Sequence, residues 1–227
     1  MRIICFLVIV FSSLKGFSQG EEALLKVIRD RLQKVKDYQA SGRMTIDVPF
    51  INAKPSNVKV YYKRPDLFKV VKEGGVSILP KGGVSVNLNA LLASDSYTIV
   101  PVGKAVLKNI TTKVIKLLPL DDQSDIVIST LYIDEKAKVI RKAIVTTKEN
   151  GSYELEMDYG KYIDWGLPDR MVFIFSLKDY KLPKGVTFEY EKGEKKKAAP
   201  DPNKPGRVEI VYQAYSINKG VADSIFK

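Results

Sequence analysis

Hydrophobic side chains first recur at three- and four-residue steps, over residues 22–38. That spacing places them along one face of an amphipathic helix, with charged side chains on the other faces. The apolar positions are Leu24, Val27, Ile28, Leu32, Val35 and Tyr38. We predict a helix here that covers or supports the rest of the fold.

From about residue 40 the repeat shortens to two residues, which is the period of a strand with one buried face. Val58, Val60 and Tyr62 alternate with more polar neighbours, and residues 153–159 alternate in the same way. Further β-rich runs cover residues 141–147, 171–175, 186–190 and 208–215. The pattern predicts a large antiparallel sheet.

Several segments interrupt the strands. Asn150-Gly151 favours a tight hairpin turn between two of them. Residues 87–94 have helical spacing, and residues 219–226 are predicted to form a short terminal helix with Asn218 as its cap. Residues 193–206 are expected to be a solvated loop, because they contain three prolines and the run Lys195-Lys196-Lys197.

Some of the predicted strands are apolar on both faces. In residues 126–133, Ile126, Ile128 and Tyr132 have one parity while Val127, Leu131 and Ile133 have the other. Such strands need cover on both sides. Two interpretations stay open: a sheet covered by helices or curled into a barrel, and a curved sheet whose concave face holds an apolar ligand.

The N-terminal residues have the order of a secretory signal peptide. Arg2 precedes an apolar run over residues 3–11, which is too short to span a membrane, and small residues follow. We expect residues 1–19 to be removed, with the cut after Ser18 or after Gly20, and residues 20–227 to form one domain. The chain's single cysteine, Cys5, lies inside the leader, so the mature protein would have neither a disulfide nor a lipid anchor of its own.

The chain is basic, with a net charge of +11 that falls to +9 when the leader takes Arg2 and Lys15 with it. For an exported protein this charge favours anionic headgroups, acidic partners or plain solubility over nucleic acid. We expect an exported monomer that does not bind nucleic acid.

The residues give little support for catalysis. The chain has no histidine, and the expected mature chain has no cysteine, which excludes the common nucleophilic triads and most transition-metal sites. The paired carboxylates Asp121-Asp122 and Glu154 with Glu156 are the remaining candidates for acid/base work, but a turn and a polar strand face explain them better. We predict no catalytic residues, metal or cofactor.

The motif Lys63-Arg64-Pro65-Asp66-Leu67-Phe68, at the end of an alternating strand, resembles the periplasmic outer-membrane lipoprotein carrier family (LolA/LolB-like). Residues 131–134, 166–169 and 215–226 resemble the lipoprotein-sorting group of that family. The resemblance covers most of the mature chain. It implies an α+β, mostly β fold: an incomplete antiparallel β-barrel, formed by a strongly curved sheet, with helices over its concave face.

The resemblance also implies a function without chemistry, in which the concave face shelters acyl chains of lipoproteins or other lipids between an inner-membrane donor and an outer-membrane acceptor. The family's motif arginine, which helps hold the lid to the barrel, corresponds to Arg64, and strand parity puts Arg64 on the side of Tyr62. The expected lid residues are Leu88, Leu91 and Leu92, and the expected wall residues are Val58, Val60, Tyr62 and Phe68. The alternative is an envelope interaction or sensor protein that binds a partner through its basic surface.

Overall fold

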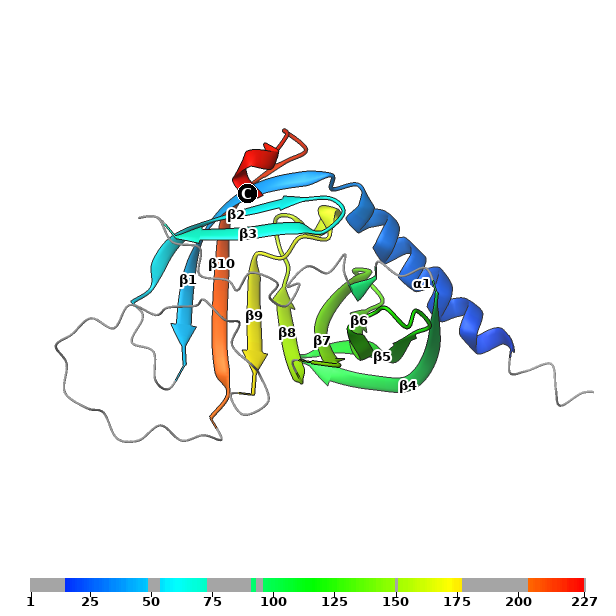
Figure 1. Cartoon of the computed structure of the whole chain (residues 1–227). Helices are drawn as coiled ribbons and strands as arrows, with labels where there is room; N and C mark the ends of the chain where they lie inside the picture. Colours follow the sequence, from blue (N-terminus) through cyan, green and yellow to red (C-terminus); the bar gives the residue numbers. More distant parts are fainter. Residues whose placement is uncertain are drawn as a thin grey trace, which may run out of the picture.

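The computed structural model describes residues 15–48, 54–72, 91–92, 96–149, 151–176 and 204–226, with the side chains of residues 15–19 excepted. In this part of the chain, one α-helix precedes a ten-stranded antiparallel sheet (Figure 1). There are also two short 3-10 helices: η1 (Ile163–Trp165) lies between the eighth and ninth strands, and η2 (Asp223–Phe226) follows the last strand. The prediction of a mostly β fold is confirmed.

The strands follow one another as a meander, except where the two ends of the chain meet. Their order is β3-β2-β1-β10-β9-β8-β7-β6-β5-β4, so the first and the last strand lie side by side in the middle of the sheet. The strands are β1 (Asp37–Asp47), β2 (Ser56–Lys63), β3 (Leu67–Lys72), β4 (Tyr97–Leu107), β5 (Ile110–Pro119), β6 (Ile126–Asp134), β7 (Val139–Thr147), β8 (Ser152–Asp158), β9 (Arg170–Phe175) and β10 (Gly206–Ile217).

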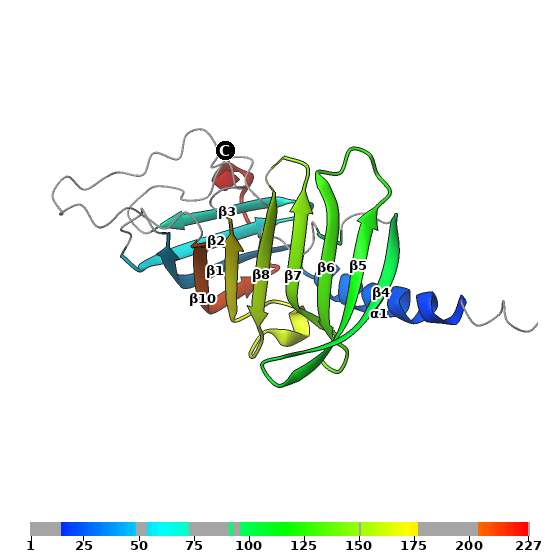
Figure 2. The ribbon, with the colours of Figure 1, turned by 90° about the horizontal axis from the view of Figure 1, so that it is seen from below.

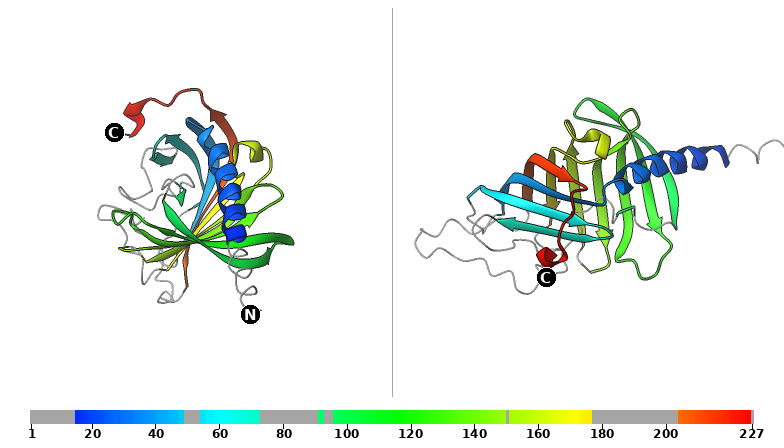
Figure 3. Two further views of the ribbon diagram at one scale, coloured as in Figure 1. Left: turned by 90° about the vertical axis from the view of Figure 1, so that its right-hand side faces the viewer. Right: turned by 90° about the horizontal axis from the view of Figure 1, so that it is seen from above.

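The sheet is open rather than closed into a barrel, because β3 and β4 are its two ends within the described residues. The strands at the β3 end run across the direction of β6 to β8 (Figure 2). The helix α1 (Lys15–Gln33) crosses one face of this sheet and packs against β4 (Figure 3). We call this the inner face. The sequence predicted several covering helices, whereas the described residues contain this one α-helix.

Alternation along the strands explains why the inner face is apolar. In β2, the side chains of Val58, Val60 and Tyr62 are buried while those between them are exposed or half-buried. In β8, Tyr153, Leu155 and Met157 are buried in the same way, so both strand predictions are confirmed. The runs predicted at residues 141–147, 171–175 and 208–215 lie within β7, β9 and β10.

The strands on either side of the predicted turn, β7 and β8, pair as an antiparallel hairpin, and of the two predicted turn residues Asn150 lies outside the described residues. Gly151 has a φ of 68°, the left-handed conformation that glycine adopts without steric cost. The sequence did not indicate a comparable turn between β4 and β5, where Lys108 and Asn109 have φ values of 47° and 65°. Two successive left-handed residues suit a two-residue hairpin connection.

The predicted limits of the helix were wrong at its C-terminal end. The helix stops at Gln33, so Val35 lies in the connection to β1 and Tyr38 belongs to β1 itself. Both side chains are still buried, with 1% and 8% of their surface exposed. The helical spacing continued across the junction because the connection and the strand also send these side chains into the core.

The C-terminal prediction also needs correction, since the terminal helix is a 3-10 turn and Asn218 does not cap it. The Asn218 side chain instead bonds the connection between α1 and β1: its Oδ1 accepts from the Lys36 backbone N–H (2.7 Å), and its Nδ2 donates to the Lys34 carbonyl (2.8 Å). The predicted strand at residues 186–190, the lysines Lys195 to Lys197 and most of residues 87–94, Leu88 included, lie outside the described residues.

Candidate ligand-binding face

The wall residues predicted on β2 are buried in the apolar core, one strand from the β3 end of the sheet. Val58, Val60 and Tyr62 have 2%, 0% and 1% of their surface exposed. Strand register extends them sideways: Val60 pairs with Ala40 of β1 and Val70 of β3, and Tyr62 pairs with Tyr38 and Phe68. Phe68 is half-buried and packs against the same core. These residues therefore form two apolar rows across three strands.

The helix α1 and part of the predicted lid belong to the same apolar core. Leu25, Ile28 and Leu32 of α1 are buried in it, as are Leu91 and Leu92. The predicted wall residues are thus covered rather than open to water.

Arg64 lies just beyond the end of β2 and is exposed. Its Nη1 donates to the backbone carbonyl of Gln33, the last residue of α1, at 3.0 Å. Its own backbone N–H donates to the Lys36 carbonyl at 2.9 Å. A cation at a helix C-terminus meets carbonyls that have no partner inside the helix and the negative end of the helix dipole. Arg64 therefore joins the end of β2 to the C-terminal end of α1.

A second arginine on α1, which the sequence did not single out, makes comparable contacts. Arg31 Nη1 donates to the carbonyls of Ala137 (2.8 Å), Lys138 (3.1 Å) and Ile163 (3.4 Å). The helix is thereby joined to the turn between β6 and β7 and to η1. One end of the guanidinium therefore lies among three backbone carbonyls, which its positive charge attracts.

The N-terminal half of α1 is held by charged groups. The Glu21 side chain is 3% exposed, and its Oε1 lies 2.9 Å from Lys113 Nζ on β5. Its hydrogen bond to Glu21 raises the pKa of Lys113, although burial acts in the opposite direction. Glu21 Oε2 is buried and has no hydrogen-bond partner in the described part of the chain. A buried oxygen without a partner costs free energy, which offsets part of what the ion pair with Lys113 contributes.

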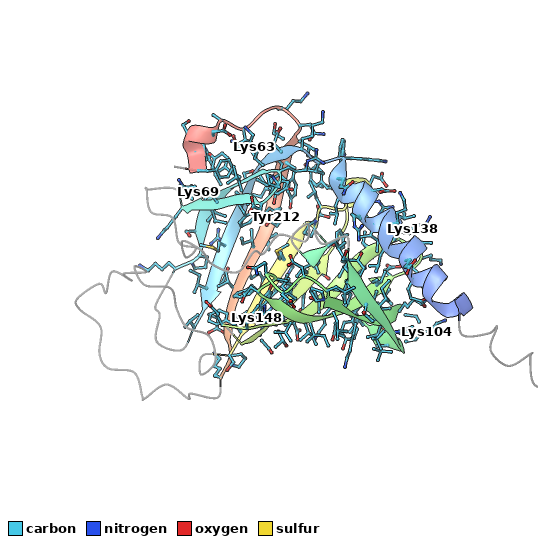
Figure 4. The ribbon with its side chains drawn as sticks, turned by 45° about the vertical axis from the view of Figure 1, so that its right-hand side comes forward. Lys63, Lys69, Lys104, Lys138, Lys148 and Tyr212 are labelled. Atoms are coloured by element: carbon cyan, nitrogen blue, oxygen red, sulfur yellow. The ribbon has the colours of Figure 1, made fainter. Side chains whose placement is uncertain are left out.

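A cluster of tyrosines lies beside the predicted wall and was not foreseen. Tyr38 packs on Tyr62 and on Tyr215, with both centroid separations 5.3 Å. Tyr215 also contacts Tyr162 and Tyr212, at 4.8 Å and 4.9 Å. Figure 4 labels Tyr212, on β10. The cluster joins three strands and a loop that are distant in sequence, so no local pattern could have revealed it.

Burial keeps these phenols protonated. It is the main cause that raises the pKa of Tyr38 and of Tyr215 well above the ordinary tyrosine value, and neighbouring phenols add to the effect. The Tyr215 hydroxyl donates to the Pro168 carbonyl at 2.8 Å. The cluster therefore places uncharged phenols beside the aliphatic rows.

The carboxylates considered for catalysis have local roles. Asp121 Oδ1 accepts from the Gln123 backbone N–H (2.9 Å), which stabilises the turn before β6. Glu154 pairs with Lys142 across β8 and β7, at 2.5 Å. Within the described residues, no group of three or more acidic, histidine or cysteine side chains is placed to hold a metal ion, and no helix is long and apolar enough to cross a membrane.

The fold is an open antiparallel sheet with a helix over its apolar face, and solved structures share it. A domain from Vibrio parahaemolyticus described as outer-membrane lipoprotein-sorting superposes with a TM-score of 0.52 at 10% identity, covering 90% of this chain and 96% of the domain. A LolA superfamily protein from Nitrosomonas europaea gives 0.51 at 9% identity, covering 89% and 97%. A DUF1329 family protein from Desulfovibrio piger gives 0.51 at 13% identity, covering 91% and 96%.

No protein-family model matches the chain, and no curated protein matches its sequence. The similarity is therefore one of fold, carried over nearly the whole length of both partners in each comparison. The resemblance to lipoprotein carriers that the sequence predicted is confirmed at the level of fold.

Proposed function

We propose that the protein is a non-catalytic carrier or chaperone of the periplasm that shelters the acyl chains of lipoproteins or other lipids. In this proposal the sheet acts as an incomplete barrel. Its inner face takes the chains when α1 and the Leu91–Leu92 segment move away, and Val58, Val60, Tyr62 and Phe68 form the wall. An inner-membrane donor would load the carrier and an outer-membrane acceptor would unload it.

The observation that supports this most is the contrast between two kinds of contact made by α1. Its packing on the inner face is apolar, through Leu25, Ile28 and Leu32. The contacts that fasten its ends are polar, as in Arg64 with the Gln33 carbonyl and Glu21 with Lys113. Water can replace such polar contacts when the helix moves, at a net cost of about 1 kcal/mol each. The apolar face has no such replacement, so an open state needs an apolar ligand.

The expected ligand affinity follows from the area that is removed from water. Each methylene group that enters the fold contributes about 0.8 kcal/mol, which is about a fourfold gain in affinity. A series of fluorescent fatty acyl probes that differ in chain length should therefore bind about fourfold more tightly per added methylene until the inner face is full. An affinity that does not depend on chain length would contradict acyl binding.

Native mass spectrometry tests the proposal on the protein as it occurs in its own envelope. After gentle isolation, we expect a fraction of the protein to carry a mass that extraction with organic solvent releases and lipid analysis identifies as acylated. The bare chain alone would count against a carrier. Partner capture that vanishes at raised ionic strength, and that Arg64→Leu leaves unchanged, would instead favour the basic-surface alternative.

A further inference from the structure

The chain has a single tryptophan, and its side chain is partly exposed to solvent. Trp165 ends η1 and has 37% of its surface exposed. A large aromatic side chain is normally buried, because it removes more apolar area from water than almost any other residue. An exposed tryptophan at the tip of a short turn is therefore a feature to explain.

The contacts around η1 place this tryptophan at the end of the molecule where α1 stops. Arg31 Nη1 donates to the carbonyls of both Ile163 in η1 and Lys138 in the turn between β6 and β7. A Cβ added to Gly166, the next residue after Trp165, would lie 3.0 Å from Leu32 Cδ2. Figure 4 also shows Lys138 beside α1. Three separate segments thus meet at Trp165.

Three of the exposed lysines belong to the segments that meet here. The Lys34 backbone N–H donates to the Arg31 carbonyl (3.2 Å), and Lys138 and Lys161 belong to the two segments that Arg31 joins. We call Trp165 with these lysines the Trp165 face, whose lysines are Lys34, Lys138 and Lys161.

The acidic groups nearby do not neutralise this face. Asp164, next to Trp165, is the exposed carboxylate on η1. Glu135 is engaged with Lys113 at 3.4 Å, and Asp30 is engaged with Lys26 at 2.6 Å. Among the described residues, the side chains of Lys34, Lys138 and Lys161 form no ion pair, so these three cations outnumber the exposed carboxylate of Asp164 and are available to a partner.

We propose that the Trp165 face docks the protein on an anionic phospholipid surface. Tryptophan is the side chain that most favours the boundary between headgroups and acyl chains, because its ring is apolar and its indole N–H is a donor. Lysines near an anionic bilayer add attraction that falls off within a Debye length. The surface goes beyond the proposed function, although a carrier of lipids would use it to approach the membranes that it serves.

The single tryptophan makes the test direct. The protein is mixed with vesicles of phosphatidylcholine alone, or of phosphatidylcholine with phosphatidylglycerol, at low and at high salt. We expect the Trp165 emission to shift to shorter wavelength only with the vesicles that contain phosphatidylglycerol. Brominated acyl chains in these vesicles should quench the emission, and high salt should reverse the shift. Binding without any change in Trp165 emission would overturn the proposal, as would equal binding to both vesicles.

Two triple variants separate this face from the overall basic charge of the chain. Replacing Lys34, Lys138 and Lys161 by Gln should weaken binding to the anionic vesicles on the order of a hundredfold, about fivefold for each lysine near the surface. The matched control replaces three exposed lysines on β2, β3 and β4, namely Lys59, Lys72 and Lys104, and should weaken it less than tenfold. Equal losses in the two variants would overturn the proposal.

Two further results identify which claim has failed. Binding of an acidic polypeptide such as polyglutamate, without binding of anionic vesicles, would overturn membrane docking and assign the face to a protein. Acylated cargo seen by native mass spectrometry without vesicle binding would refute the Trp165 face alone, whereas vesicle binding without cargo would refute the carrier alone.

Discussion

The hydrogen bond between Arg64 and the end of α1 gives the most specific prediction about how the inner face becomes accessible. Arg64→Leu removes the donor to the Gln33 carbonyl and leaves the backbone bond from Arg64 N–H to the Lys36 carbonyl in place. A hydrogen bond from a charged donor contributes about 1.5–3 kcal/mol, but Arg64 is exposed, so we take about 1 kcal/mol. That loss raises the population in which α1 is detached about fivefold.

Native-state hydrogen exchange measures this population directly. In Arg64→Leu, amides of α1 from Leu25 to Leu32 should exchange about fivefold faster, while amides of the central strand β7 keep their rates. Lys59→Leu is the matched control, because Lys59 is an exposed cation on the same strand as Tyr62 and points away from the inner face. Unchanged exchange in α1, or an equal acceleration in α1 and β7, would refute the reasoning.

Three other perturbations have defined outcomes. Gly42→Ala should lower the free energy of unfolding by about 1–3 kcal/mol in urea titration, because its Cβ would lie 2.7 Å from the Val211 carbonyl oxygen; wild-type stability would contradict this packing. Val60→Ala should cost about 2 kcal/mol, since Val60 is fully buried, and a loss under 0.5 kcal/mol would contradict it. Burial alone would raise the pKa of Asp134, but the hydrogen bonds from the Ala137 N–H and the Arg141 guanidinium outweigh burial and lower the pKa below its ordinary value of 3.8. The ionised Asp134 side chain therefore stabilises the folded protein above about pH 4, and this stabilisation is lost as the pH falls through the lowered pKa. In Asp134→Asn the free energy of unfolding should therefore fall less steeply as the pH is lowered below about 4, and an unchanged pH dependence would exclude this role.

The strands could be predicted because their alternation is a local property. Alternation within a single strand predicts its buried face without reference to the neighbouring strands. It does so for β2, at Val58, Val60 and Tyr62, and for β8, at Tyr153, Leu155 and Met157. Where a strand is apolar on both faces, the pattern is ambiguous. In β6, Leu131 is buried in the core while Val127 keeps 48% of its surface exposed.

The groups that hold the helix could not be predicted, because they depend on how distant segments meet. The sequence gives no sign that Arg31 would reach carbonyls more than a hundred positions away, or that Asn218 would bond the connection after α1. The tyrosine cluster has the same origin, since Tyr38 and Tyr215 meet only because the first and last strands pair. Arg64 was found early because its motif was recognised, not because of its spacing.

The central claim is that the inner face of the sheet receives an acyl chain, and photo-crosslinking tests it most directly. A fatty acid with a diazirine in its chain is bound to the full-length protein, irradiated, and its adducts are mapped by peptide mass spectrometry. We expect adducts on the inner face at Val58, Val60 and Tyr62, and an unlabelled fatty acid should prevent their formation. Adducts confined to the outer side of β2, at Lys59 and Tyr61, would contradict it.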